Sequence, residues 1–335
     1  MSGSGGVSCL ALLSALVVLH PTAARMVLGV NGHYPTQEPY ATEISPAQQL
    51  TDAASLGASM YRTTFPPAAD PRGAHLAAFV ANATARKIAV LPIVGTGFNA
   101  SATPAATEQA YFDLARELAA AHPSIAVWEL GNELADRCIV PGTNGDTVLD
   151  YRDAPFAIAL AQLRGLDRGI RAGSTLAGVR TTVDAGWLHY GFFDRLRANG
   201  FDWDITSWHW YSNMGDVRNA SAKHVDVLAR LRGYGKPIWF TECDREAGSN
   251  GTSGGAQQAA YFAALLPVLE EAGVAVAIAY ELYDQPALAP SPEALYGVWG
   301  KPAAAALRVF SKRVGSDPAV ELKRAERAPL SIPTI

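Results

Sequence analysis

Charged residues are scarce and balanced in this chain of 335 residues: they make up 17% of it, and the formal net charge is −4. No run of Lys or Arg occurs, so the charge pattern offers no support for binding to nucleic acid. No apolar stretch reaches the roughly 18 residues that would span a bilayer. With 49% hydrophobic residues, the chain can bury a sizeable core, as one large domain or as two ordinary ones.

Cysteine is also rare, and neither a C-x-x-C nor an H-x-x-x-H spacing occurs, so we expect no metal site and no cofactor. Cys9 lies in the N-terminal leader, which leaves Cys138 and Cys243. Two thiols of an exported protein can pair, or they can stay apart as small buried hydrophobic side chains. We expect the second outcome, because the two segments follow strands that are far apart in the predicted fold.

The N-terminal residues have the pattern of a secretion signal. Residues 10–19 form an apolar run, and small residues ending at Ala24 follow it, although no Lys or Arg precedes Arg25. We expect residues 1–24 to be a signal peptide, with a disordered leader as the alternative. Residues 25–335 are then the mature domain, and the protein is secreted or periplasmic.

From residue 27 onward, short apolar runs of strand length alternate with longer runs of helical period. The predicted strands are residues 27–30, 59–63, 88–94, 125–130, 176–179, 203–208, 237–241 and 274–280. The predicted helices are residues 46–56, 74–86, 108–121, 155–171, 187–198, 222–232, 257–271 and 303–314. A loop of about twenty residues is expected after Glu133.

Near-continuous apolar strands separated by helices require a parallel sheet with crossover connections. Eight such units in about 290 residues fit an α/β fold of one domain, a single (β/α)8 TIM barrel. The alternative is an open doubly wound sheet. It is disfavoured because the Gly-rich phosphate fingerprint is missing after the first strand.

Two of these strands lead into a glutamate, Glu133 and Glu242. A carboxylate at the tip of a buried strand is unusual, because the strand belongs to the core and the acid does not. In a barrel, catalytic residues lie at the C-terminal ends of the strands. Cleavage of a glycosidic bond needs one carboxyl group as proton donor and another as nucleophile or base, so the two tips suit this reaction. The alternative is two unrelated acids that end their strands.

Other strand ends carry groups that could serve such a site. Arg62 could lie beneath Glu242 and keep it ionised, or form an ordinary salt bridge at the barrel rim. Tyr211 could orient Glu242, and His209 lies two residues earlier on the same face of an extended chain, though either could simply pack. Asn132 could hydrogen-bond a sugar hydroxyl or be a turn residue.

Aromatic rings bind sugars by lying against their apolar C–H faces. Aromatic or imidazole side chains close to strand ends are the candidates, and each could equally belong to the core: His33, Tyr34, Trp210, Tyr280, Tyr283 and Trp299. Of these, we predict that His33, Trp210, Tyr280 and Trp299 contact the substrate. Trp128 and Trp239 lie inside strands and are expected in the core.

These motifs resemble those of the clan A glycoside hydrolases, which are retaining (β/α)8 enzymes. In that clan an Asn-Glu pair ends strand four and a Glu ends strand seven, and Asn132-Glu133 and Glu242 match those positions. Residues 204–211 look like the strand-six element D-x-x-x-x-H-x-Y of the clan.

Two family-level resemblances can be distinguished. Residues 280–284 and 296–303 are similar to the end of the barrel in secreted members of family 39 and in relatives that cut bacterial exopolysaccharides. The run Trp-Glu-Leu-Gly-Asn-Glu at 128–133 also resembles the heparanase-type glucuronidases of family 79.

The resemblance implies a monomeric, secreted, retaining glycosidase that acts on a poly- or oligosaccharide, with residues 25–335 as its catalytic domain. It assigns the acid/base role to Glu133 and the nucleophile role to Glu242. The alternatives are a heparanase-like β-glucuronidase, a non-catalytic carbohydrate-binding barrel, and a metal-dependent barrel hydrolase.

Overall fold

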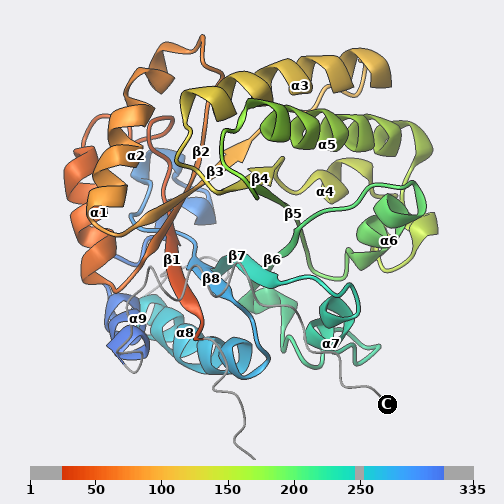
Figure 1. The fold of residues 1–335 in the computed structure, drawn as a ribbon. Helices are drawn as coiled ribbons and strands as arrows, with labels where there is room; N and C mark the ends of the chain where they lie inside the picture. Colours follow the sequence, from red (N-terminus) through yellow and green to blue (C-terminus); the bar gives the residue numbers. More distant parts are fainter. Residues whose placement is uncertain (1–24, 246–252, 313–335) are drawn as a thin grey trace, which may run out of the picture.

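The computed structural model describes residues 25–245 and 253–312 as a closed barrel of parallel strands surrounded by helices (Figure 1). The predicted (β/α)8 fold is therefore confirmed. The strands are β1 Val27–Asn31, β2 Met60–Thr64, β3 Ala89–Val94, β4 Val127–Leu130, β5 Arg180–Gly186, β6 Ile205–Tyr211, β7 Ile238–Asp244 and β8 Val276–Ala279. The barrel closes where β1 pairs with β8, with Val27 opposite Val276.

The helices are α1 Pro46–Ser55, α2 Leu76–Ala85, α3 Pro104–Ala121, α4 Leu134–Cys138, α5 Asp153–Gly173, α6 Tyr190–Ala198, α7 Val227–Arg232, α8 Gly254–Glu271 and α9 Pro302–Lys312. Helix α1 has the predicted start, because Pro46 lies in its first turn and the Ser45 side chain accepts from the N–H of Gln48. Helix α4 begins directly after Glu133, so the expected loop is in part helical.

The prediction of the fifth strand at residues 176–179 was wrong. Gly178 has a φ of 84°, in the left-handed region, which a strand cannot accommodate, and the segment is a turn. The strand is Arg180–Gly186 instead, where β-branched side chains dominate the first half. This shift matters for the site, because it moves Asp184 into the barrel wall.

The inside of the barrel changes from apolar to polar along the strands. One apolar cluster gathers side chains from nearly every strand, and it can do so only in the interior: Val27, Met60, Leu91, Val127, Ile205, Trp239, Val276 and Ile278. Residues two positions apart on a strand share a face. Two steps along from Met60 and Val127 the interior therefore becomes charged, with Arg62 and Glu129. The second, larger apolar cluster packs the helices against the outside.

The predicted signal peptide, residues 1–24, lies outside the described residues, and so does the segment 313–335. Among the helices that the structure describes, none is both long and apolar enough to cross a membrane.

Candidate active site

The two glutamates singled out in the sequence meet at the C-terminal mouth of the barrel. Glu133 follows β4 and directly precedes α4, whereas Glu242 lies within β7. An oxygen of each carboxyl group and a ring nitrogen of His209 all lie within 4.8 Å of one another. Closure of the barrel brings these side chains together from strands that are far apart in the sequence.

Glu242 is held as a carboxylate by donors on two sides. Arg62 Nη1 donates to its Oε1 at 2.7 Å, and the Tyr211 hydroxyl donates to its Oε2 at 2.6 Å. Burial acts to raise the pKa of Glu242, but the positive charges of His209 and Arg62, with these hydrogen bonds, hold the pKa below its usual value. Glu242 is therefore ionised at neutral pH and fixed in orientation.

Glu133 has a different environment, since its side chain is 38% exposed. Its Oε1 lies 2.8 Å from Nδ1 of His209, and its backbone N–H donates to Oδ1 of Asp184 at 2.6 Å. Its φ of 49° is in the left-handed region, which residues other than glycine seldom adopt. The structure thus surrounds one carboxyl group with donors and leaves the other accessible, as different roles for the two would require.

His209 connects the two carboxyl groups. Its Nδ1 is bonded to Glu133 and lies 3.6 Å from Oε2 of Glu242, and its side chain is completely buried. Burial acts to lower the pKa of His209, but the charge of Glu242, the bond to Glu133 and the charge of Asp184 raise the pKa to about 9. The ring is therefore positively charged at neutral pH.

Arg62 lies in the centre of the polar interior and is only 1% exposed, so it is not an ordinary ion pair at the rim. It makes five hydrogen bonds, which matches the five N–H groups of a guanidinium. The acceptors are Glu129 Oε2 and Oε1 at 2.6 and 3.1 Å, Asn31 Oδ1 and Asn132 Oδ1 at 2.8 Å, and Glu242 Oε1 at 2.7 Å. Because Asn132 uses its oxygen here, its NH2 group is the part that can reach a sugar hydroxyl.

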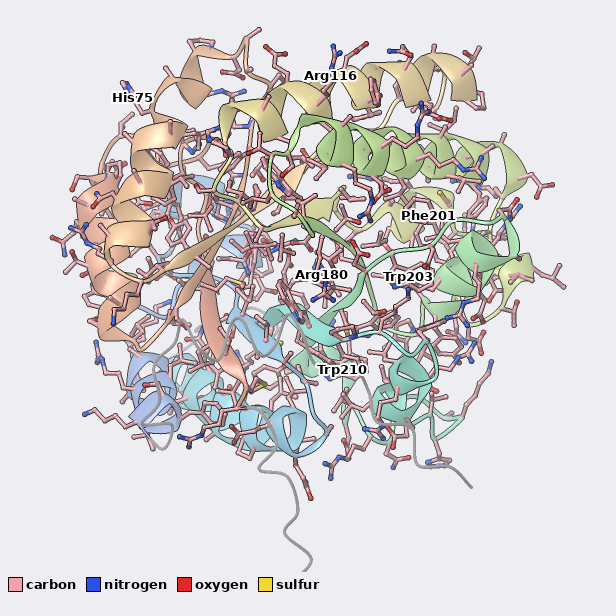
Figure 2. The ribbon with its side chains drawn as sticks, viewed as in Figure 1. His75, Arg116, Arg180, Phe201, Trp203 and Trp210 are labelled. Atoms are coloured by element: carbon pink, nitrogen blue, oxygen red, sulfur yellow. The ribbon has the colours of Figure 1, made fainter. Side chains whose placement is uncertain are left out.

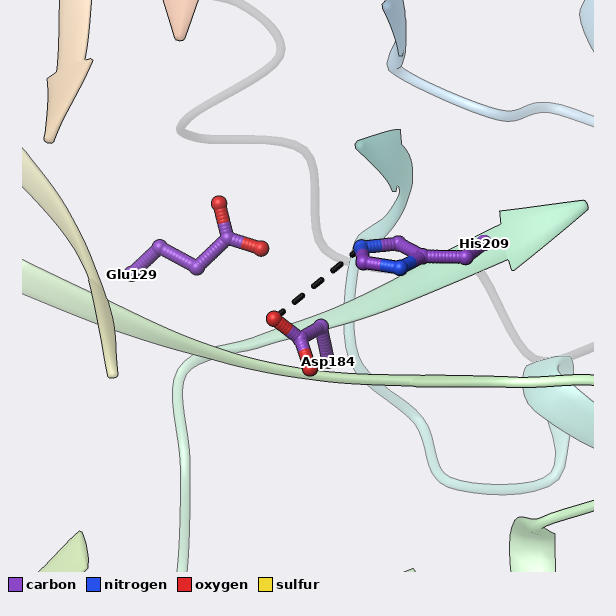
Figure 3. Close-up of side chains that lie close together, drawn as sticks. All are labelled: Glu129, Asp184 and His209. Carbon is purple, nitrogen blue, oxygen red and sulfur yellow. Dashed lines mark ion pairs between the residues drawn. The ribbon is translucent and has the colours of Figure 1, made fainter. Parts of the chain in front are cut away.

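Sequence reasoning missed three buried polar residues of this network: Asn31, Glu129 and Asp184. Each lies inside a strand and points inward with the apolar cluster of the barrel. For Glu129 a signal was present, because a carboxylate two positions from Val127 in an otherwise apolar strand lies on the same, inner face. Figure 3 shows Glu129 and Asp184 beside His209.

A cleft of about 710 Å³ opens at Glu242 and passes along the loops after β1, β2 and β3 to Tyr111 of α3. His33 and Tyr280, both predicted to contact substrate, line this cleft. Their rings meet edge to face, with centroids 5.7 Å apart. Nε2 of His33 lies 3.0 Å from Oε2 of Glu281.

The structure contradicts the prediction that Trp210 contacts substrate. Its side chain is fully buried, stacks on Trp187 with centroids 6.1 Å apart, and donates from Nε1 to the carbonyl of Gly215 at 3.0 Å. It lies between the barrel and the surrounding helices, as Trp203 does (Figure 2). His209 and Tyr211 face inward, so the residue between them must face outward.

Trp299 is partly buried and is not among the residues that line this cleft; the guanidinium of Arg308 of α9 lies over its ring, 5.6 Å from the centroid. Its contact with substrate stays a prediction. Tyr34 and Tyr283 are core residues. Tyr34 stacks on Phe79, and the hydroxyl of Tyr283 donates to Oδ2 of Asp52 at 2.7 Å.

Two groups of side chains in the described part bring possible metal ligands within 4.8 Å of one another. They are Glu129, Asp184 and His209, and Glu133, His209 and Glu242. In the first, both Glu129 oxygens already accept from Arg62, whose guanidinium supplies positive charge where a cation would bind. In the second, His209 is itself charged. We assign no metal role to either group.

Cys138 and Cys243 are both buried and unpaired, as predicted. Burial raises the pKa of Cys138 to about 12 and that of Cys243 well above its usual value, so neither thiolate forms at neutral pH.

We therefore expect the folded protein, produced from Arg25 onward, to react very slowly with a thiol reagent at pH 7. Both thiols should titrate in denaturant without reductant. A count of zero in denaturant would mean that they pair in solution.

No family model matches this sequence, and no curated protein matches it at a significant level. Solved structures do resemble it. The GH5_18 protein from Streptomyces cattleya, solved with GlcNAc, has a TM-score of 0.64 at 18% identity over 88% of this chain and 82% of its own. The hyperthermophilic β-glucosidase from Pyrococcus furiosus has a TM-score of 0.63 at 11% identity over 92% of this chain and 98% of its own.

A family 39 glycoside hydrolase from Bacteroides cellulosilyticus WH2 has a TM-score of 0.62 at 17% identity over 86% of this chain. This chain covers 64% of that protein, less than two thirds of its length. The three neighbours are glycosidases, and at these identities the likeness shows a common fold. The chain thus shares a (β/α)8 barrel with these glycosidases.

Proposed function

We propose that this protein is a retaining glycoside hydrolase that cleaves β-glycosidic bonds in a poly- or oligosaccharide. The observation that carries the proposal is the approach of a Glu133 oxygen to within 4.8 Å of a Glu242 oxygen. Retaining enzymes hold their two carboxyl groups about 5–5.5 Å apart, whereas inverting enzymes need about 6.5–9.5 Å to admit a water molecule. The short separation supports direct attack by one carboxylate.

In the first step, Glu242 attacks the anomeric carbon and the glycosidic bond breaks, while Glu133 gives its proton to the leaving oxygen. Arg62 and Tyr211 hold the nucleophile by its two oxygens. In the second step, Glu133 takes a proton from water, the water oxygen bonds to the anomeric carbon, and Glu242 leaves. His209 binds Oε1 of Glu133 and so leaves Oε2 to carry the proton.

The stereochemistry of the product tests this mechanism. Aryl β-glycosides of glucose, galactose, mannose, xylose and N-acetylglucosamine should be screened for release of the phenol. With the best substrate, the first sugar detected by proton NMR should be the β-anomer, and the α-anomer should appear only later by mutarotation. An α-anomer as first product would overturn the assignment of Glu242 as nucleophile.

The cleft favours a neutral sugar over a uronic acid. The three basic side chains that line it already face carboxylates: His33 that of Glu281 at 3.0 Å, Arg72 that of Asp70 at 2.6 Å, and Arg62 those of the central network. A further carboxyl group, that of Glu293, lies 3.4 Å from the hydroxyl of Tyr280. Burial, and after it the charges of Glu242 and Glu281, raise the pKa of Glu293. An incoming carboxylate would therefore meet several carboxyl groups on this side of the site.

We therefore expect kcat/KM for the best neutral aryl β-glycoside to exceed that for the aryl β-glucuronide by more than about tenfold, or about 1.4 kcal/mol. Glu293→Gln removes one negative charge that repels a glucuronide, so it should reduce the difference in kcat/KM between the two substrates. Glucuronide hydrolysis at the rate of the neutral substrates would support the heparanase-like alternative. Binding of glycans without any turnover would support the carbohydrate-binding barrel.

We also propose that the protein is a secreted or periplasmic monomer whose partner is a carbohydrate. The apolar run at residues 10–19 and the small residues ending at Ala24 support secretion, and the sequence has no Lys/Arg run that would point to nucleic acid. The monomeric state is an expectation without a structural observation behind it.

A further inference from the structure

Asp184 is a buried carboxylate behind the site, reached by no step of the mechanism above. It lies in β5 and is 2% exposed. Its Oδ1 accepts the backbone N–H of Glu133 at 2.6 Å. Its Oδ2 lies 4.0 Å from Nε2 of His209 (Figure 3). Nδ1 of the same ring binds the Glu133 side chain. Asp184 therefore binds the backbone of Glu133 directly and faces the His209 ring that binds the Glu133 side chain.

We propose that Asp184 is a positioning residue that aims the acid/base Glu133, by accepting its backbone N–H and by confining the His209 ring. The inference rests on the proposed function, because it needs Glu133 to be the acid/base.

The first support is the backbone of Glu133. Its φ of 49° lies in the left-handed region, which is unfavourable for a residue with a Cβ. Such a conformation persists only where the surroundings impose it. A short hydrogen bond to a buried carboxyl oxygen does so, and Gly131, two residues earlier and with a φ of 76°, allows the tight turn.

The second support is the way His209 is enclosed. Among the described residues, its Nε2 and the Asp184 Oδ2 are both buried atoms without a hydrogen-bond partner. They face each other, and Nη2 of Arg62 lies 3.8 Å from the same oxygen. Burial raises the pKa of Asp184 well above its usual value; the charge of Glu129 adds to this, while the charges of His209 and Arg62 act against it. In either state Oδ1 remains free to accept the N–H of Glu133.

Substitutions of Asp184 distinguish a role in positioning Glu133 from a role in packing alone. Asp184→Ala removes the acceptor, and Asp184→Asn keeps it. A misplaced catalytic group can cost about 10²-fold. We expect Asp184→Ala to lose about that much in kcat/KM on aryl glycosides with poor leaving groups, which depend on the proton from Glu133. On dinitrophenyl glycosides, which need little protonation, the loss of kcat/KM should be small. Asp184→Asn should keep the leaving-group dependence of the wild type.

The double variant Glu133→Ala/Asp184→Ala completes the test. If Asp184 acts through Glu133, its loss should add nothing to the effect of Glu133→Ala on kcat. Equal losses on good and poor leaving groups, or additive losses in the double variant, would overturn the proposal. An Asp184→Asn variant that loses as much activity as Glu133→Ala would also overturn the proposal. This variant tests the proposal even if Asp184→Ala does not fold. If Glu133→Ala itself has wild-type activity, it is the proposed function that fails.

Discussion

Replacing Glu242 by glutamine is expected to abolish turnover while the barrel stays folded. Removal of a catalytic nucleophile commonly costs several orders of magnitude in kcat. The amide has the shape of the carboxylate, so Arg62 can still donate to its oxygen and the Tyr211 hydroxyl can accept from its NH2 group, yet the amide cannot attack the anomeric carbon. We expect at least a 10⁴-fold loss of kcat on every aryl glycoside, irrespective of the leaving group.

This loss of kcat must be distinguished from the effect that removal of any buried acid in β7 would have. Asp244→Asn provides the matched control, because Asp244 is equally buried in the same strand and is bonded to Gln258 at 2.8 Å, outside the catalytic network. This variant should keep kcat within about tenfold of the wild type. A 2-fluoro glycoside with a good leaving group should label the wild type on Glu242, as peptide mass spectrometry will show. Label on another residue, or activity in Glu242→Gln, would exclude Glu242 as nucleophile.

The charge removed in Glu242→Gln also has a predictable effect on stability. The pKa of Glu242 is lower in the folded protein than its ordinary value, so its ionisation stabilises the fold above the unfolded pKa of about 4.3. That contribution disappears as pH falls through the folded pKa. The difference in free energy of unfolding between wild type and Glu242→Gln should therefore be greatest at neutral pH and should shrink in acid.

The fold was predictable because each strand is a short apolar run and each helix an amphipathic one, so hydrophobic periodicity alone indicates the alternation. The fifth strand was the exception. The strand Arg180–Gly186 is not an apolar run, because Thr182 and Asp184 point into the charged layer of the barrel. The apolar residues that begin at Leu176 were therefore predicted as the strand instead.

The site was predictable where its residues follow strands, because the strand ends of a barrel meet on one face. Glu129 and Asp184 were missed because their role depends on the register between strands, in which Ile93 pairs with Glu129 and Asp184 with Ser207. Trp210 shows a different limit. Strand alternation already placed it opposite His209, but the general affinity of aromatic rings for sugars was given more weight.

Replacing Glu133 by alanine should give a loss that depends on the leaving group. General acid catalysis is worth about 10²–10⁴-fold, so we expect that loss of kcat/KM on substrates with poor leaving groups. Dinitrophenyl glycosides leave without a proton, so their kcat/KM should fall far less. Alanine keeps both the Cβ and the N–H bonded to Asp184, so the backbone conformation at this position should survive.

The second half of the reaction gives the sharper result. Without Glu133 no group takes the proton from water, so the glycosyl-enzyme on Glu242 should accumulate and kcat on dinitrophenyl glycosides should become slow. Azide is already an anion and needs no base. Added azide should therefore restore turnover and yield the β-glycosyl azide, detectable by NMR.

Asp136→Ala is the matched control. Asp136 is a half-exposed acid in α4 that lies 2.9 Å from Nδ1 of His189, and its variant should behave as the wild type. Equal losses on all leaving groups, without any response to azide, would make Glu133 a structural residue, and the acid/base would have to be sought elsewhere among the carboxyl groups of the cleft.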